Sequence, residues 1–410
     1  MQINKYQLAN GLRLIHNYDD STSMVAVNVL YNVGAKDEDP QRTGFAHLFE
    51  HLMFGGSVNI PDYDGPLQNA GGDNNAWTNN DMTNYYLSIP YQNIETGFWL
   101  ESDRMLSLAF SEKSLEVQRQ VVMEEFKQVA LNQPYGDVQH LNRALCYTEH
   151  PYRWPTLGKE LSHIEHATIA DVKAFFGKFY TPNNAILSVS GSISFEDCVK
   201  LAEKWFGPIP KGQVYKRNLP KEPQQTAARF LEVQRKVPTS AIYKTYPICE
   251  RINPDYYVCD MITDILAHGR SSRLFQHLVM DKSIFSEINA YVSGEVEPGS
   301  LQIYGKPASG VSLEEADIAI QEELSKLYDS PIGEREIEKV KNKYESSDLF
   351  SNISCSSKAS NLAIFELLGD AAMIDHEVEK YRSVNANDIK NMASKIFDPS
   401  LCSTLYYKHS

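Results

Sequence analysis

The sequence lacks two features that would place it in a membrane or outside the cell. It has no apolar run long enough to span a bilayer, and its first residues, Met1 to Lys5, lack the apolar core of a signal peptide. Its six cysteines are scattered, with no CxxC pair. We therefore expect free thiols in a reducing, cytoplasmic setting, while noting that a chain already trimmed of a leader would begin in the same way.

Positive charge is also scarce. The chain has 39 Lys and Arg against 53 Asp and Glu, which gives a formal net charge of −14 and a pI near 5.3. This balance argues against nucleic acid or an anionic membrane as a partner and weakly favours neutral or basic peptides. With 410 residues, of which 42% are hydrophobic, the chain is long enough for two or more globular domains.

The most informative segment is His47-Leu48-Phe49-Glu50-His51, which has the spacing H-x-x-E-H. In a helix, His47 and His51 project from one face and can bind one zinc ion, while Glu50 lies beside them as a candidate base. The alternative is an exposed surface helix that carries two histidines. The largely apolar setting favours a buried site instead; it consists of Phe45, Ala46, Leu48, Phe49, Leu52, Met53 and Phe54.

A catalytic zinc needs a third protein ligand and an open fourth position. The segment from Ser111 to Gln133 predicts a helix, because Ser111 is a suitable N-cap and neither Gly nor Pro occurs before Pro134. Its apolar stripe consists of Leu115, Val122, Phe126 and Val129.

Two glutamates on this predicted helix are candidates for the third ligand. Glu125 is spaced to point with the stripe, whereas Glu124 falls on a more mixed flank. We expect Glu125 to bind the metal. We expect Glu124 to lie next to the metal ligands without binding the metal itself, or on the surface. The alternative for either residue is a solvated helix glutamate, which is the commoner fate of this residue type.

The order of predicted elements favours an α+β fold of two homologous domains with mixed sheets flanked by helices. Strand-like alternation occurs between Leu12 and Val33, and a polar, Pro-rich stretch follows Gly207. We predict a zinc-bearing domain at 1–210, a linker at 211–227, and a homologous domain without the zinc site at 228–410.

An internal repeat supports this division. The motif His47 to Leu52 is echoed by Arg273-Leu274-Phe275-Gln276-His277-Leu278. Asp171-Val172-Lys173 with Pro182 is matched at the same offset by Asp388-Ile389-Lys390 with Pro399. Because the second copy has Arg273 and Gln276 in place of His47 and Glu50, only the first half is expected to hold this site.

With these motifs, the chain resembles over nearly its full length the inverted-zincin peptidases, the family of insulysin, pitrilysin and mitochondrial processing peptidase. The resemblance implies one half of a clamshell that encloses peptides, with Zn²⁺ bound by His47, His51 and Glu125 and with Glu50 as the general base. The segment from Gly71 to Thr78 is similar to the family's substrate-binding edge strand, which implies that a peptide pairs near Asn75 and Ala76. The resemblance also implies a homodimer or a heterodimer with a related subunit.

The chain departs from the family pattern in two places. Gln118 stands where many members have a second glutamate, seven residues before the distal ligand. Active members also use an Arg and a Tyr of the second domain to hold the substrate. The candidates are Arg270, Arg273, Tyr243 and Tyr304, and a partner chain is the alternative source.

The expected function is therefore zinc-dependent endopeptidase activity on short or unfolded peptides within an enclosed chamber. Two other functions remain open for this fold. One is a non-catalytic core-type assembly subunit, and the other is a chaperone-like peptide-binding module. Zinc content and turnover of a quenched peptide discriminate among the three.

Overall fold

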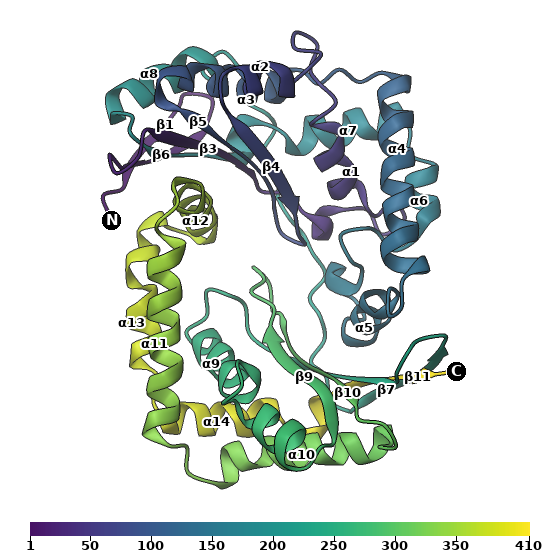
Figure 1. Cartoon of the computed structure of the whole chain (residues 1–410). Coiled ribbons are helices and arrows are strands. Elements are labelled where there is room, and N and C mark those ends of the chain that lie inside the picture. The colour runs from purple at the N-terminus through teal and green to yellow at the C-terminus, as the bar shows by residue number, and fades with distance from the viewer. The chain divides into compact units, whose positions relative to one another are not determined.

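The computed structural model describes residues 1–410, which form two compact units. The first unit comprises residues 1–128, 154–220 and 349–376, and the second comprises 129–153, 221–348 and 377–410. Each unit has one mixed β-sheet with helices packed against it, which confirms the predicted fold class (Figure 1). None of the helices is both long and apolar enough to cross a membrane.

The sheet of the first unit has six strands in the order β1-β2-β6-β3-β5-β4. Their bounds are β1 (Asn4–Gln7), β2 (Arg13–Tyr18), β3 (Met24–Tyr31), β4 (Asp73–Thr78), β5 (Thr83–Pro90) and β6 (Ala185–Gly191). Strands β2 and β6 are parallel, and all other neighbours are antiparallel. Strand β4 therefore lies at a sheet edge, with one side of its backbone unpaired.

The helices of the first unit come from three parts of the sequence. They are η1 (Ala35–Asp37), α1 (Phe45–Leu52), α2 (Asp64–Asn69), η2 (Tyr91–Asn93), α3 (Ile94–Leu106), α4 (Glu112–Phe126), α6 (Leu161–Glu165), α7 (Ile169–Phe179), η5 (Pro182–Asn184), α8 (Phe195–Trp205), α12 (Cys355–Leu368) and η7 (Ala371–His376). The predicted N-cap is confirmed, because the Ser111 hydroxyl accepts a hydrogen bond from the Ser114 N–H at 3.0 Å. The chain then continues from α4 into a π-helix, η3 (Lys127–Asn132).

Strand β3 shows how this sheet is covered on both faces. Val25, Val27 and Val29 alternate along the strand and point into the main core. Ala26 points the other way and packs with Cys355 and Ala359 of α12. A helix from late in the sequence therefore covers the second face of the first unit's sheet.

The second unit has a five-stranded sheet in the order β7-β11-β8-β10-β9. The strands are β7 (Arg229–Arg235), β8 (Ala241–Pro247), β9 (Phe285–Val292), β10 (Ser300–Pro307) and β11 (Ser403–His409). Strands β7 and β11 are parallel and the remaining neighbours are antiparallel. This is the topology of β2-β6-β3-β5-β4 in the first unit. The five strands of the second sheet therefore each have a counterpart in the first, and β1 is the additional strand.

The helices of the second unit also come from separate parts of the chain. They are α5 (Val138–Cys146), η4 (Pro151–Arg153), α9 (Asp255–Ala267), η6 (Phe275–Asp281), α10 (Leu313–Asp329), α11 (Glu334–Ser351), α13 (Glu377–Ser383), α14 (Ala386–Ile396) and η8 (Pro399–Leu401). Val138 of α5 packs with Tyr243, Leu405 and Tyr407 on one face of the sheet. Helix α5 therefore covers this sheet as α12 covers the other.

The repeat around Asp171 and Asp388 adopts the same local structure in both units, whereas the motif is α-helical at Phe45–Leu52 and its counterpart forms a π-helix at Phe275–Asp281. Thr168 and Asp171 form a capping box at the start of α7, and Asn385 and Asp388 form one at the start of α14. Each helix is followed by a short 3₁₀ turn that begins with proline and then by a central strand. The duplication that the sequence indicates is thus visible in matched helices and strands.

The compact units differ from the predicted ranges in two places. The chain passes from the first unit to the second between Pro220 and Lys221, inside the stretch predicted as a linker. However, residues 129–153 belong to the second unit and residues 349–376 belong to the first. The ranges 1–210 and 228–410 remain a prediction for the limits of the duplicated halves.

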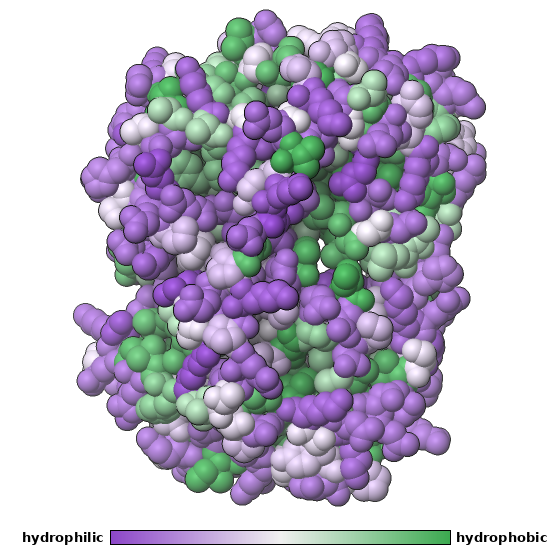
Figure 2. Space-filling view, turned by 180° about the vertical axis from the view of Figure 1, so that it is seen from behind, coloured by the Kyte–Doolittle hydropathy of each residue, from purple (hydrophilic) through white to green (hydrophobic).

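The surface seen in Figure 2 is mostly hydrophilic, with hydrophobic side chains scattered among the polar ones. This agrees with the expected globular class, because monomeric soluble proteins expose apolar residues mostly in small groups.

Candidate metal centre

Helices α1 and α4 position the candidate metal ligands. Helix α1 carries His47 and His51 four residues apart, so that their side chains lie on one face. Its other face is buried through Leu48 and Phe49, both fully inaccessible to solvent. Helix α4 packs against α1 and presents Glu125 to the two histidines.

Three atoms converge between these helices. His47 Nε2 and His51 Nε2 are 3.3 Å apart. Glu125 Oε2 lies 3.5 Å from His47 Nε2 and 3.3 Å from His51 Nε2. These three residues form the one cluster of His, Cys, Asp and Glu in the chain with metal-binding geometry.

The spacing of the three atoms fits a zinc ion. Zinc bonds to nitrogen and oxygen of about 2.0–2.1 Å in a tetrahedron place the ligand atoms roughly 3.3 Å apart. The two rings are nearly perpendicular, at 88° with their centroids 4.8 Å apart, so both nitrogens can point to a common centre. The donor set, two imidazoles and one carboxylate, is that of a catalytic zinc site with an open fourth position.

The electrostatic surroundings keep the ligands in the forms that a metal requires. Burial lowers the pKa of His47, with the charges of Glu125 and Glu50 acting in the opposite direction. The pKa of Glu125 is also lowered, chiefly by its hydrogen bond with His51. A neutral imidazole and an ionised carboxylate are the ligand forms that bind zinc.

The neighbouring glutamates occupy different environments. Glu50 is half-buried on α1 and near enough to His47 to influence its pKa. Glu124 is exposed and forms an ion pair with Lys127 at 2.7 Å, so it lies on the surface of α4. Gln118 is half-buried on α4, two turns before Glu125. The geometry thus groups Glu125, and not Glu124, with the histidines.

The predicted substrate residues lie on the sheet edge beside α1. Asn75 and Ala76 belong to β4 and pair with Tyr86 and Tyr85 of β5, which leaves the opposite side of β4 open. The Asn75 side chain accepts a hydrogen bond from the Ala76 N–H at 2.8 Å. Because β4 contacts α1, the open edge lies close to the candidate metal site.

Three of the four candidate arginines and tyrosines of the second unit make contacts with other side chains. Arg273 donates two hydrogen bonds to Glu336, at 2.9 and 2.8 Å. Tyr304 donates to Glu287, and Tyr243 is buried against the Tyr304 ring. Arg270 is exposed. All four residues belong to the second unit, whereas the metal ligands belong to the first.

Sequence reasoning missed two residues that hold α1 in place. Glu38 accepts hydrogen bonds from the start of α1, and the Tyr85 hydroxyl donates to the Phe49 carbonyl at 3.3 Å. The sequence indicates only that a cap is missing, because Gly44 directly precedes the helix and has no side chain with which to cap it.

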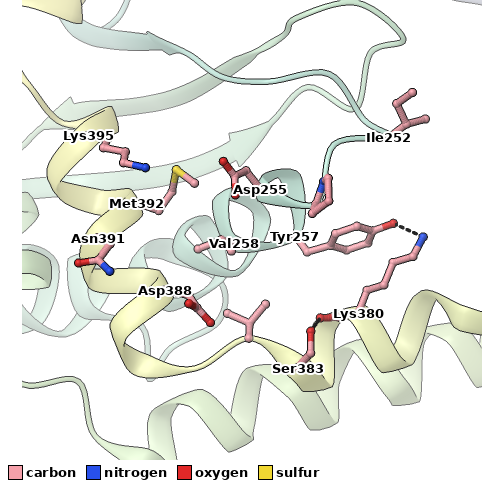
Figure 3. Close-up of a pocket in the computed structure, with 12 residues that line it drawn as sticks. Ile252, Asp255, Tyr257, Val258, Lys380, Ser383, Asp388, Asn391, Met392 and Lys395 are labelled. Atoms are coloured by element: carbon pink, nitrogen blue, oxygen red, sulfur yellow. Dashed lines mark hydrogen bonds between the residues drawn. The ribbon is translucent and has the colours of Figure 1, made fainter.

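A pocket lies within the second unit (Figure 3). It has a volume of about 450 Å³ and is bounded by α9 and α14. Its lining mixes Asp255, Asp388 and Lys395 with Val258 and Met392, and it includes no histidine. This composition does not match the chemistry of the cluster on α1 and α4.

Comparison with family models gives two matches along the chain. Residues 13–159 match the family described as Insulinase (Peptidase family M16). Residues 166–344 match the family described as Peptidase M16 inactive domain. The boundary between the matches precedes α7, and the metal ligands lie in the first.

Two curated relatives are similar over almost the whole chain. A zinc protease, PqqE, from Helicobacter pylori is 27% identical over 98% of this chain and 91% of its own length. An uncharacterized zinc protease, YmxG, from Bacillus subtilis is 27% identical over 96% of both chains.

A solved structure is also closely similar. The crystal structure of a protease from Helicobacter pylori superimposes with a TM-score of 0.93 at 25% identity, covering 99% of both chains. The motif, the paired sheets and these matches agree. The chain belongs to the M16 family of peptidases, with a match to the insulinase description followed by a match to the inactive-domain description.

Proposed function

We propose that the chain is a zinc-dependent endopeptidase that acts on short or unfolded peptides within an enclosed chamber. The observation that carries this proposal is the convergence of His47 Nε2, His51 Nε2 and Glu125 Oε2 to within 3.5 Å of one another. Glu50 lies on α1 together with the two histidines. Its relatives' description as zinc proteases supports the same metal.

His47, His51 and Glu125 would hold the zinc ion. When bound, the ion supplies a Lewis acid and lowers the pKa of water to about 7. Glu50 then accepts a proton from the attacking water and returns it to the leaving amine, which makes it the general base and then the general acid.

The open edge of β4 would hold the peptide. An extended peptide can add to this edge through main-chain hydrogen bonds near Asn75 and Ala76, in the manner of an additional strand. A folded protein cannot present its backbone in this way. We therefore expect unstructured peptides of a few tens of residues to be cleaved and stably folded proteins to resist.

The test combines metal analysis with peptide turnover. Purified protein should contain about one zinc per chain and cleave a quenched peptide, and a chelator should abolish cleavage in a manner that added zinc restores. Zinc without cleavage would instead support a peptide-binding module. Absence of both zinc and cleavage would support a non-catalytic assembly subunit.

We also propose that the active particle is a dimer, formed by two copies or with a related subunit. This rests on the pairing of one zinc-bearing domain with one domain that has lost the motif, which resembles the half-size members of the family. Solution scattering on active enzyme tests it, because a strictly monomeric and fully active protein would contradict the pairing.

A further inference from the structure

The helix that carries the histidines begins without a cap of its own. Helix α1 has eight residues, and its N-cap is Gly44, which has a φ of 88° and no side chain. The first N–H groups of any helix lack partners within the helix, and a helix this short is marginal without outside support. The N–H groups at the start of α1 therefore need acceptors from elsewhere in the fold.

Gly44 cannot be exchanged for a capping residue. A Cβ at this position would lie 2.7 Å from the Ile164 side chain and 2.9 Å from the Leu157 carbonyl. The positive φ would also strain any other residue. The close approach of the 157–164 segment thus excludes the usual Ser, Thr, Asp or Asn from the start of α1.

Glu38 supplies the missing acceptors. Its Oε2 accepts the Gly44 N–H at 2.9 Å, and its Oε1 accepts the Ala46 N–H at 2.8 Å. The Trp154 indole N–H is a third donor, shared between Glu38 Oε2 at 3.2 Å and the Ala35 carbonyl at 3.1 Å. Glu38 is only 6% exposed, so its carboxylate depends on these donors in place of water.

Hydrogen bonds and burial act in opposite directions on the pKa of this carboxyl. Burial raises the pKa of Glu38 to about 8, while the hydrogen bonds from Ala46, Gly44 and Trp154 act to lower it. The ionised form fits the geometry, because each oxygen faces an N–H donor. A negative charge at this place also complements the positive end of the helix dipole.

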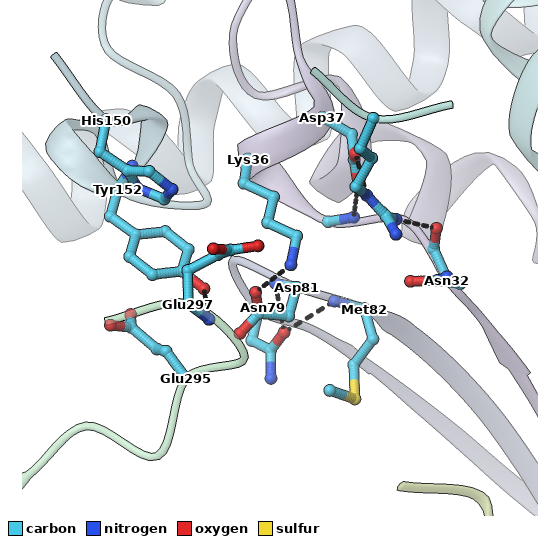
Figure 4. A network of polar contacts seen from close by, with 12 residues as sticks. Asn32, Lys36, Asp37, Asn79, Asp81, Met82, His150, Tyr152, Glu295 and Glu297 are labelled. Carbon is cyan, nitrogen blue, oxygen red and sulfur yellow. Dashed lines mark hydrogen bonds and ion pairs between the residues drawn. The ribbon is translucent and has the colours of Figure 1, made fainter. Parts of the chain in front are cut away.

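Ala35 and Lys36, which precede Glu38, make polar contacts with the turn that follows the edge strand β4. Lys36 and Asp81 form an ion pair at 2.6 Å and are both buried (Figure 4). The Lys36 N–H donates to the Asn80 carbonyl, and the Ala35 N–H donates to the Asn79 carbonyl. One short segment therefore links the end of β4 to the start of α1.

We propose that Glu38 is a positioning residue for the metal centre, acting as the remote N-cap of α1 that holds His47 and His51 at the spacing zinc requires. The inference rests on the proposed metal site but not on peptidase activity. The N–H groups that Glu38 accepts, on Gly44 and Ala46, lie within one turn of His47. Loss of these hydrogen bonds therefore changes the position and orientation of the His47 imidazole.

Zinc affinity tests the proposal directly. At pH 9, where the Glu38 carboxyl is ionised, competition with a fluorescent chelator is measured for the wild type, Glu38→Gln and Ser111→Ala. Glutamine keeps the shape but turns an N–H group toward a backbone N–H donor. We expect zinc affinity to fall roughly tenfold in Glu38→Gln, as for other groups that orient metal ligands.

Ser111→Ala is the matched control. It removes the N-cap of α4, which also carries a ligand, but Glu125 lies almost four turns away. This variant should lose thermal stability and keep the zinc affinity of the wild type. If Glu38→Gln also loses only stability, Glu38 has a structural role alone and the proposal is wrong.

A milder variant keeps the test decisive if Glu38→Gln does not fold. Trp154→Phe keeps an aromatic ring but removes one of the three donors to Glu38. We expect zinc affinity roughly threefold below the wild type. Unchanged affinity would overturn the positioning role, and a wild type that binds no zinc would overturn both this inference and the proposed function.

Discussion

The motif segment at 47–52 and its counterpart at 273–278 have the same spacing but meet a neighbouring helix through different chemistry. In the first unit, His47 faces Glu125 of α4 across 3.5 Å. In the second, Arg273 stands in the place of His47 and makes two hydrogen bonds to Glu336 of α11. His277, which stands in the place of His51, bonds instead to the buried Glu323 at 2.7 Å.

The two units differ in the charge that their own side chains supply at this position. A guanidinium carries its own charge and satisfies a carboxylate with two donors, so the second unit needs no ion at this position. Two imidazoles with a carboxylate have no permanent positive charge, and burial lowers the pKa of His47 further. An ion pair therefore occupies this position in the second unit, whereas the first unit presents three donor atoms that suit a cation.

The largest expected effect comes from removing the candidate base. Glu50→Gln keeps the shape of the site but cannot accept a proton, so peptide cleavage should fall by roughly 100-fold or more. Zinc should remain near one per chain, as measured by atomic absorption. The matched variant Gln276→Ala, at the corresponding position of the second unit, should keep wild-type cleavage. Substantial activity in zinc-loaded Glu50→Gln would remove Glu50 from the mechanism.

The next effect separates the two neighbouring glutamates of α4. Glu125→Gln exchanges a charged oxygen ligand for a neutral amide, so zinc affinity should fall by at least tenfold. Glu124→Gln should keep the affinity of the wild type, since Glu124 pairs with Lys127 on the surface. Isothermal titration with zinc checks both variants, and loss of binding in Glu124→Gln alone would shift the ligand by one residue.

Arg273→Ala tests the ion pair of the second unit. It leaves the partly buried Glu336 without its partner and should lower the free energy of unfolding by about 1–3 kcal/mol, measured in urea. Zinc stoichiometry should not change, because the metal ligands lie in the other unit. A loss of zinc at unchanged stability would mean that Arg273 affects the metal centre of the first unit and not the stability of the second.

A smaller, pH-dependent effect concerns helix α12. The hydrogen bond from Lys358 lowers the pKa of Asp19 from 3.8 to about 2. A depressed carboxyl pKa contributes stability above the unfolded pKa and loses it as the pH falls through the folded one. Asp19→Asn should therefore cost about 1–2 kcal/mol at pH 6 and only a small part of that at pH 2, where about half of Asp19 is protonated, as followed by thermal unfolding. A difference as large at pH 2 as at pH 6 would exclude this ion pair as its cause.

The sequence alone was enough to predict the features that depend on local spacing. The four-residue interval of His47 and His51 and the helical phase of Glu125 place three donors on facing helices. The repeated Asp, Lys and Pro positions predict the matched α7 and α14 in the same way.

Features that depend on contacts between distant residues could not be predicted. Nothing in the pattern of α5 or α12 shows which sheet it covers, because an apolar helix face fits either. Glu38 escaped notice for a related reason. Capping rules consider the residue next to the helix, whereas here the close approach of Ile164 to Gly44 transfers that role to a side chain six residues earlier.

The central claim is that one unit holds zinc where the other has an ion pair. Zinc-edge anomalous diffraction from crystals of the metal-loaded protein tests it most directly. The account predicts one strong peak per chain, about 2.0–2.1 Å from His47 Nε2, His51 Nε2 and a carboxylate oxygen of Glu125, and none beside Arg273. A peak at another group of side chains, or an empty site between α1 and α4 in zinc-saturated crystals, would contradict it.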